Sequence, residues 1–260
     1  MGKARHIRMI SPVVPSGDWS PESTYLETLK PLERDGLKLS SVFLDRGPQS
    51  IEYRIEEAML VPDLVDKALA AERQGVDGLV IDCMADPGVD VLRECVAIPV
   101  LGPGRLSMQV ATLLGRRFSI LVELDVVARL FEEEVQRYGL SRSFASCRVI
   151  DIPVLEIDSD IERTTALLVD AGELAVRQDH ADVLVLGCTR FSPMADALKA
   201  GLKARGLPVQ VLNPNALAIN MMVALLDSNL SHSKIAYPYP SGKKIIGFGE
   251  LISDPTQSGI

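Results

Sequence analysis

The chain repeats itself, and this internal duplication constrains its fold more than any other sequence feature. The segment GVDGLVIDC, which ends at Cys83, matches the segment HADVLVLGC, which ends at Cys188. Asp77 and Asp182 take equivalent positions in the two segments, and a short apolar run then leads to each cysteine. A repeat of this kind is typical of a chain built from two copies of one structural unit.

Further matches extend the repeat over most of the chain. The segment from Ile98 that contains Pro103 matches the segment from Leu207 that contains Pro214. In both halves the pattern predicts the order strand, helix, strand, helix, strand, cysteine, helix, strand, helix. Strands that alternate with helices indicate a parallel sheet covered by helices on both faces.

The apolar pattern supports the same fold class. The runs Leu79–Ile81 and Leu184–Leu186 are short and continuously apolar, which is typical of strands buried on both faces. We therefore predict an α/β protein with two pseudo-symmetric, flavodoxin-like domains and an active site in the cleft between them. Residues 1–114 are expected to form the first domain, completed by residues 215–260, and residues 115–214 the second.

Composition and charge exclude several classes of protein. The 260 residues carry a formal net charge of −8, so no basic excess exists to bind nucleic acid. Hydrophobic residues make up 47%, yet no run reaches the length of about 20 apolar residues that a membrane span needs. The four cysteines form no CxxC pair and no cluster with histidine, which argues against zinc and against a disulfide framework. We expect no metal, no cofactor and a reducing, cytoplasmic setting.

Two of the cysteines stand where a buried strand is expected to stop. In open parallel sheets, ligands bind at the carboxyl ends of the strands. Cys83 is followed by Asp86-Pro87 and Cys188 by Ser192-Pro193, and each pair suits the cap and first residue of a helix. Because the N-terminus of a helix favours an anion, we expect the pKa of both thiols to lie below its usual value of about 8.5.

Pseudo-symmetry adds a chemical role to these positions. If the two domains face each other across their strand ends, the two sulfurs flank one ligand. A thiolate on one side then removes a proton from a carbon next to a carbonyl, and the opposite thiol returns one, which inverts the carbon without a cofactor. Amides in the turns Met84–Asp86 and Thr189–Arg190 are placed to stabilise the enolate oxygen. Cys95 and Cys147 lack this position and are assigned to packing.

On these residues the chain resembles the aspartate/glutamate/hydantoin racemase superfamily, and most of all its hydantoin racemase branch. Four stretches carry the resemblance: Gly47–Pro62, Gly78–Glu94, Leu113–Asp125 and Val183–Leu198. The resemblance implies two flavodoxin-like domains, cofactor-independent racemisation of a small-molecule substrate, and Cys83 and Cys188 as the acid–base pair. It also implies a homo-oligomer.

The chain departs from that branch around the expected pocket. Hydantoin racemases carry Asn-Pro-Asn-Thr after the first strand, where this chain has Ser11-Pro12-Val13-Val14. They have Thr-Thr where Val122-Glu123 stands here, and Ala-Gly often follows their second cysteine where Thr189-Arg190 stands here. The substrate is therefore expected to be hydantoin-like or derived from an amino acid. The candidate substrate-binding residues are Ser11, Met84, Ala85, Glu123, Thr189 and Arg190.

The chemistry of these side chains leaves their roles open. The guanidinium of Arg190 suits a substrate carboxylate, and a solvated arginine fits the sequence equally well. Glu123 is placed either to accept a hydrogen bond from a ring N–H or an amine, or to lie at the surface or at a cap. Thr189 and Ser11 suit either a substrate oxygen or the amides of their own turns. Glu52 suits a helix cap or the site, and Trp19 a flap over the cleft or ordinary packing.

Two other functions stay open at this point. Within the same superfamily, maleate-type isomerases use one cysteine to add to a double bond, whereas arylmalonate decarboxylases keep a single cysteine as a proton donor. The decarboxylase fits less well because both positions carry cysteine here. Outside it, two doubly wound domains around a cleft also describe a non-catalytic binding protein for a small molecule. Turnover of maleate or of a chiral hydantoin separates these readings.

Overall fold

The computed structural model describes residues 4–17 and 19–241. The first half of the chain contains β1 (Arg5–Ser11), α1 (Pro21–Thr24), η1 (Tyr25–Leu29), η2 (Lys30–Leu32), β2 (Leu37–Phe43), α2 (Arg54–Arg73), β3 (Gly78–Ile81), α3 (Val89–Cys95), β4 (Val100–Leu101) and α4 (Pro103–Leu114). The second half contains β5 (Phe118–Val122), α5 (Asp125–Arg137), β6 (Phe144–Val149), η3 (Val154–Glu156), α6 (Ile161–Arg177), β7 (Val183–Leu186), η4 (Thr189–Met194), α7 (Ala195–Ala204), β8 (Gln210–Leu212) and α8 (Pro214–Asp227).

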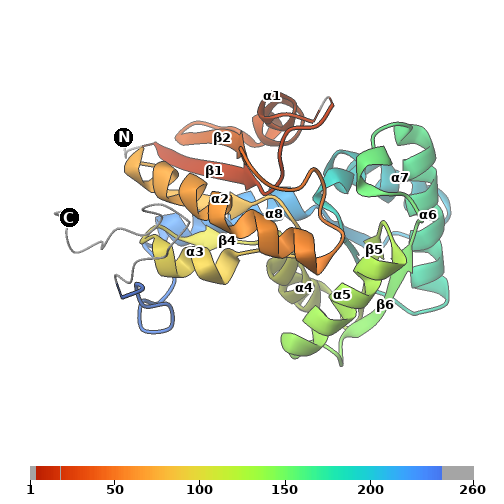
Figure 1. The fold of residues 1–260 in the computed structure, drawn as a ribbon. Helices are drawn as coiled ribbons and strands as arrows, with labels where there is room; N and C mark the ends of the chain where they lie inside the picture. Colours follow the sequence, from red (N-terminus) through yellow and green to blue (C-terminus); the bar gives the residue numbers. More distant parts are fainter. Residues whose placement is uncertain (1–3, 18, 242–260) are drawn as a thin grey trace.

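The strands form two four-stranded sheets with the same topology. Their orders are β2-β1-β3-β4 and β6-β5-β7-β8, and every pairing in both sheets is parallel. Figure 1 shows the first sheet in the red-to-yellow part of the chain and the second in the green-to-cyan part. The structure confirms the predicted α/β class and the two pseudo-symmetric, flavodoxin-like units.

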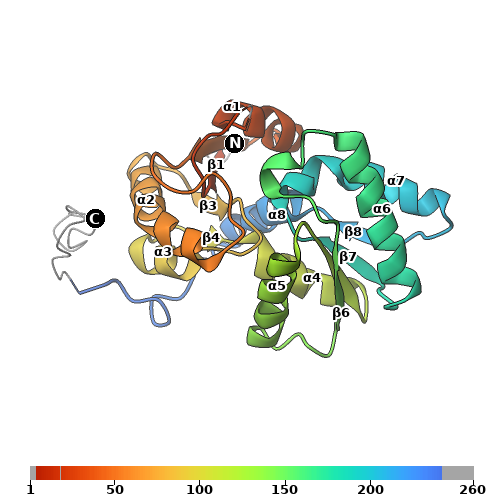
Figure 2. The same cartoon turned by 45° about the vertical axis from the view of Figure 1, so that its right-hand side comes forward.

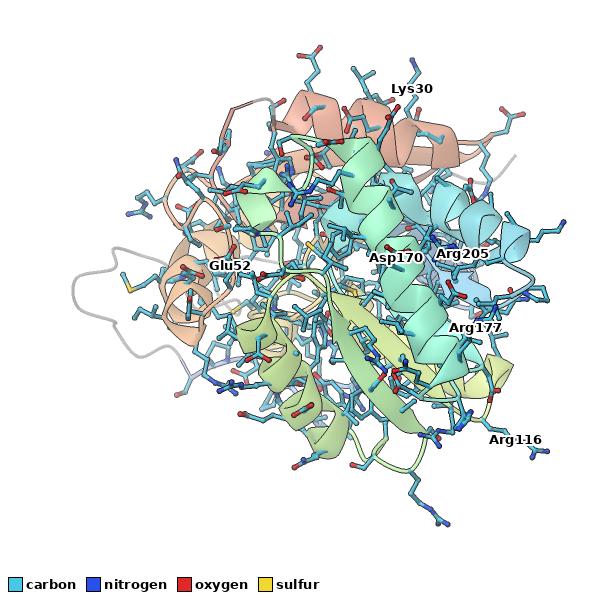
Figure 3. All side chains as sticks on the ribbon, turned by 90° about the vertical axis from the view of Figure 1, so that its right-hand side faces the viewer. Lys30, Glu52, Arg116, Asp170, Arg177 and Arg205 are labelled. Atoms are coloured by element: carbon cyan, nitrogen blue, oxygen red, sulfur yellow. The ribbon has the colours of Figure 1, made fainter. Side chains whose placement is uncertain are left out.

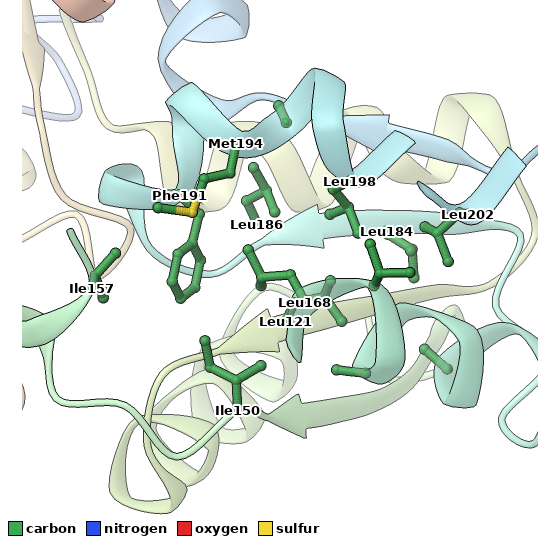
Figure 4. Close-up of a cluster of buried hydrophobic side chains, with 14 of the residues drawn as sticks. Leu121, Ile150, Ile157, Leu168, Leu184, Leu186, Phe191, Met194, Leu198 and Leu202 are labelled. Carbon is green, nitrogen blue, oxygen red and sulfur yellow. The ribbon is translucent and has the colours of Figure 1, made fainter. Parts of the chain in front are cut away.

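Both sheets bury side chains on both faces, which explains the continuous apolar runs. In β7, Leu184 and Leu186 pack against α6 and α7, while Val183 and Val185 pack on the opposite face against α4 and α5. Figure 4 shows the first of these two clusters, in which Phe191 and Met194 of η4 close one end. Every strand residue of β3 and β7 is buried, so the strand ends are held rigidly.

The last helix of each half packs on the sheet of the other half. Helix α8 covers the face of the first sheet that carries Ile7, Met9 and Val80. Helix α4 places Met108 and Ala111 against the second sheet, and Figure 2 shows it beside α5. The division into residues 1–114 and 115–214 stays a prediction, and the expected completion of the first domain by residues 215–260 lies in part outside the described residues.

Charged pairs cover the outer surface of the second half. Figure 3 shows Asp170, Arg177 and Arg205 together on the outer side of α6 and α7. Arg205 pairs with Asp170 and with Glu173, and Arg177 pairs with Glu173. Exposed pairs of this kind typically contribute only about 0–1 kcal/mol each. Within residues 4–17 and 19–241, no helix combines the length and the apolar character needed to cross a membrane.

Candidate active site

A cavity lies where the strand ends of the two halves face each other. The space between its lining residues is about 780 Å³ with the open mouth included. Cys83 from the end of β3 and Cys188 from the end of β7 both line it. The two sulfurs are near enough for negative charge on Cys83 to raise the pKa of Cys188. Equivalent positions in the sequence repeat therefore meet on one cavity.

The local sequence explains how Cys188 reaches the cavity. The amide of Gly187 donates to the carbonyl oxygen of Leu121 at 2.7 Å, which extends the pairing of β7 with β5 by one residue. A Cβ at Gly187 would lie 2.7 Å from that same oxygen, so a larger residue would push the strand end away. Cys188 is then the residue directly before η4 and stands at its N-terminal end.

The helix caps differ from the sequence prediction. Helix α3 begins at Val89 with Gly88 as its N-cap, so Asp86-Pro87 is not its cap and first residue. Asp86 instead accepts hydrogen bonds from the amides of Gly104 and Arg105, at 2.7 and 2.8 Å, in the first turn of α4. A positive φ of 51° at Asp86 turns its carboxylate toward that helix. Ser192-Pro193 lies inside η4, and the buried Ser192 hydroxyl has no hydrogen-bond partner among the described residues.

The prediction that both thiols have lowered pKa values is wrong. Burial raises the pKa of the Cys83 thiol, and the carboxylates of Asp86, Glu57 and Asp82 raise it further. Burial also raises the pKa of the Cys188 thiol, with Glu123 as the next cause. The backbone amides of Ala85 and Arg190, each two residues after a cysteine, act in the opposite direction. Desolvation outweighs these amides, so both sulfurs rest as thiols.

Glu123 stands at the end of β5 beside this pair. Its residue is only 3% exposed, it lines the cavity, and its Oε2 has no hydrogen-bond partner among the described residues. Burial raises the pKa of this carboxyl to about 8, and the charge of Glu52 adds to the effect. The surface or cap role considered from the sequence does not apply, because this side chain is buried at the cavity.

Arg190 is held in the site rather than solvated. Its side chain is 10% exposed, pairs with Asp158, and lies over the Trp19 ring at 4.1 Å from the ring centroid. Nε and Nη1 are buried without a hydrogen-bond partner in the described part of the chain. Trp19 lines the same cavity and packs edge-on against Phe43. Arg190 and Trp19 together therefore form one wall of the cavity.

Asp82, directly before Cys83, lines the cavity and is held in place by hydrogen bonds. Ser11 donates to its Oδ2 at 2.9 Å and Asn215 to its Oδ1 at 3.0 Å. Thr189 lines the cavity, and its hydroxyl contacts the Asp82 carbonyl oxygen at 3.3 Å. Ser11 is fully buried and does not line the cavity, so its side chain serves Asp82. The bond from Asn215 links α8 to the strand end of the first sheet.

The remaining predicted residues line the cavity with several that the sequence did not indicate. Met84 and Ala85 form part of the wall, and so does Glu52, whose Oε1 accepts a hydrogen bond from the Val154 amide at 3.0 Å across the two halves. The lining residues that sequence reasoning missed include Arg54, Glu57, Asp82, Glu134 and Val154. One signal was available, because Glu134 follows Val127, Leu130 and Phe131 on one face of α5.

Carboxyl groups outnumber guanidinium groups in the lining of the cavity. Five carboxyl side chains line it, and its two guanidinium groups both have carboxylate partners. Arg54 pairs with Glu133, and Arg190 pairs with Asp158. The carboxyl residues are Glu52, Glu57, Asp82, Glu123 and Glu134. Within the described residues, no group of three or more His, Cys, Asp or Glu side chains is arranged to hold a metal ion.

Comparison with known proteins gives one consistent result. The family model described as Asp/Glu/hydantoin racemase matches residues 24–222. The hydantoin racemase of Rhizobium meliloti is 38% identical over 201 residues, which cover 77% of this chain and 81% of that protein. The hydantoin racemase of a Pseudomonas strain is 30% identical, with 84% of this chain and 86% of that protein covered. The solved allantoin racemase from Klebsiella pneumoniae superposes with a TM-score of 0.85 at 26% identity, covering 94% and 96% of the two chains.

Proposed function

Since this chain belongs to the Asp/Glu/hydantoin racemase family, we propose that it racemises a small cyclic substrate by proton transfer between Cys83 and Cys188, without a cofactor. Membership makes the chain an isomerase of the racemase type. The single observation that carries the finer proposal is the meeting of these two cysteines, equivalent in the repeat, on one cavity.

The proposed mechanism keeps protons in balance. One sulfur enters the cycle as a thiolate and the other as a thiol. The thiolate takes the proton from the carbon next to the substrate carbonyl, and the electron pair of the broken C–H bond moves into an enolate. The opposite thiol then gives its proton to the other face of that carbon and becomes the new thiolate. The amides of Ala85 and Arg190 support whichever sulfur is charged.

Because both thiols are protonated at rest, only a small fraction of the enzyme carries the thiolate that starts this cycle. Because burial raises the pKa of both sulfurs, the thiolate is a minor species in the free enzyme. A thiolate of high pKa is in return a strong base, which suits removal of a weakly acidic C–H proton. General acid–base catalysis by one group typically contributes about 10²–10⁴-fold to the rate.

The cavity supports a neutral substrate over a dianion. A hydantoin-like ring carries no charge, whereas maleate carries two negative charges into a site with five carboxyl groups and two engaged arginines. A free amino acid brings a carboxylate to two arginines that each already pair with a carboxylate of the chain, although Nε and Nη1 of Arg190 have no partner among the described residues. We therefore place hydantoin-like rings first among substrates. The maleate-type reaction is the alternative, and comparing turnover of maleate with turnover of a chiral hydantoin separates the two.

The test is solvent exchange in heavy water with single cysteine variants. A chiral hydantoin is expected to exchange its reacting proton and lose optical activity with the native protein. Cys83→Ser and Cys188→Ser should each reduce racemisation by about 10²-fold or more, while exchange of one enantiomer survives at the sulfur that remains. The matched controls are Cys95→Ser and Cys147→Ser, which are expected to keep native rates. Native turnover in Cys188→Ser would rule out the two-base mechanism.

Two further parts of the proposal concern the state of the protein. The chemistry requires both sulfurs in the reduced form, one as a thiolate and one as a thiol, and the described cysteines are all free, which suits a reducing compartment such as the cytoplasm. Self-association, which the resemblance implies, is tested by the molar mass from light scattering.

A further inference from the structure

The Glu123 carboxyl group has a hydrogen-bonding position that no described residue fills. It is 3% exposed and its Oε2 contacts no donor or acceptor among the described residues, although it lines the cavity with both cysteines. A buried polar atom left without a partner destabilises a protein, because it loses its bonds to water and gains none in return. Such an atom at a cavity wall indicates that a ligand supplies the missing partner.

Burial and neighbouring charge favour the neutral form of Glu123, whereas its own backbone amide, which hydrogen-bonds the carboxylate, acts in the opposite direction. Glu52, before α2, faces it with a like charge, and the apolar walls remove water. Cys188 at the end of β7 and Cys147 on β6 are also close enough for a charge on Glu123 to act on them. All three neighbours are acids, and none offers a cation to hold a carboxylate.

We propose that Glu123 binds the substrate as a neutral carboxylic acid, pairing with the adjacent C=O and N–H of a ring amide. This inference rests on the proposed racemase function and names the chemical class of its substrate. The O–H of the acid donates to the ring carbonyl, and its second oxygen accepts from the ring N–H.

Geometry restricts this pairing to amides whose N–H is cis to the C=O, as in a ring. An open-chain secondary amide is almost always trans, so its C=O and N–H point to opposite sides and cannot both meet one carboxyl group. A five-membered ring holds the amide cis and presents both groups on one edge. A substrate carboxylate has no N–H to offer and would meet the Glu52 and Glu57 carboxyl groups in the same cavity. The site therefore selects cyclic amides and ureides over amino acids.

The pairing also serves the chemistry. Because Glu123 lies beside Cys188, the carbonyl it binds is held next to the carbon that the sulfurs attack. When that carbon loses its proton, negative charge develops on the carbonyl oxygen, and a hydrogen bond from an acid to that oxygen becomes stronger.

The experiment measures ring binding separately from turnover. The probe is dimethylhydantoin with both methyl groups on the reacting carbon, which has the ring but no proton to transfer. Its N-methylated form, which lacks the ring N–H donors, is the ligand control. Dissociation constants are measured by calorimetry from about pH 6 to about pH 8.5 for the native protein, Glu123→Gln and Glu123→Met, after each variant is shown to keep native thermal unfolding.

The expected results follow from protonation. The native dissociation constant should rise about fourfold over that range, because the acid form is lost as the pH passes about 8. Glu123→Gln keeps one donor and one acceptor, so its binding should be within about threefold of native at pH 6 and independent of pH. Glu123→Met should weaken binding by about tenfold or more, and the N-methylated ring should bind equally weakly to all three proteins.

Opposite results separate the two proposals. Binding that tightens with pH, or a Glu123→Gln protein as weak as Glu123→Met, would mean that Glu123 acts as an anion and would overturn the inference. Failure of the probe to bind a protein that racemises a chiral hydantoin would also overturn it. Binding with the expected pH dependence, but without exchange at any carbon, would support the inference and defeat the proposed function.

Discussion

The substitution Gly104→Ala tests how tightly the Cys83 turn depends on helix α4. Gly104 is in the first turn of α4, and a Cβ built there lies 1.9 Å from the carbonyl oxygen of Met84, the residue after Cys83. An ordinary contact needs at least 3.4 Å, so the helix or the turn must move by about 1.5 Å. The atom in the way belongs to the backbone, so no side-chain rotation relieves the overlap.

Both stability and rate are expected to fall. Overpacking of this kind costs about 1–3 kcal/mol, and for a chain of this size each kcal/mol lowers the melting temperature by about 2–4 °C. A displacement of about 1 Å in a catalytic group can cost about 10²-fold in rate, so kcat should fall by about that factor. Differential scanning calorimetry and a racemisation assay, each run on the purified variant, measure the two effects.

The matched control is Gly201→Ala in α7. Its Cβ meets only the Val169 side chain, at 2.7 Å, and alanine gains helix propensity of about 1 kcal/mol over glycine. That variant should therefore keep native kcat and change little in melting temperature. A Gly104→Ala protein with native kcat and native melting temperature would refute the claim that α4 fixes the Cys83 turn.

Two further predictions concern the thiols and the core. Because burial raises the pKa of both site cysteines, alkylation of Cys83 and Cys188 by iodoacetamide should stay slow at pH 7 and accelerate only above about pH 9, as followed by peptide mass spectrometry; a rate that is already maximal below pH 8 would contradict this. Leu198→Ala removes a fully buried side chain from the cluster drawn in Figure 4, and it should lower the free energy of unfolding in urea by about 2–5 kcal/mol. Asp170→Ala, on the nearby surface, should lower that free energy by less than about 1 kcal/mol. Equal losses in these two variants would show that the core in Figure 4 is not the stabilising element.

The sequence predicts the architecture well because the repeated segments and their apolar runs coincide with the buried strands. The runs before Cys83 and Cys188 indicate buried strands, and the structure confirms two parallel sheets of identical order. The partner of α4 was not predictable in this way. The apolar face of α4 shows that it packs on something, but periodicity carries no information about which of two similar sheets it covers.

The sequence predicts the positions of the two site cysteines but not the direction in which their pKa values shift. The positions of Cys83 and Cys188 at strand ends place them on the cavity, yet the sign of their pKa shift depends on burial, which a local motif does not report. Asp86 illustrates the same limit. Its sequence position suggests a cap for the next helix, whereas its partners are amides 18 and 19 residues further along the chain.

Because α4 packs on the second sheet and α8 on the first, the two repeats depend on each other to complete their cores. A polypeptide stopped after residue 114 would lose α8 from the face that carries Ile7, Met9 and Val80, and would leave Met108 and Ala111 of α4 without the second sheet. We therefore expect neither half to fold stably alone in its present form. Two separate fragments would have to assemble with each other, as the subunits of an interlocked dimer do, before either one buried its interior.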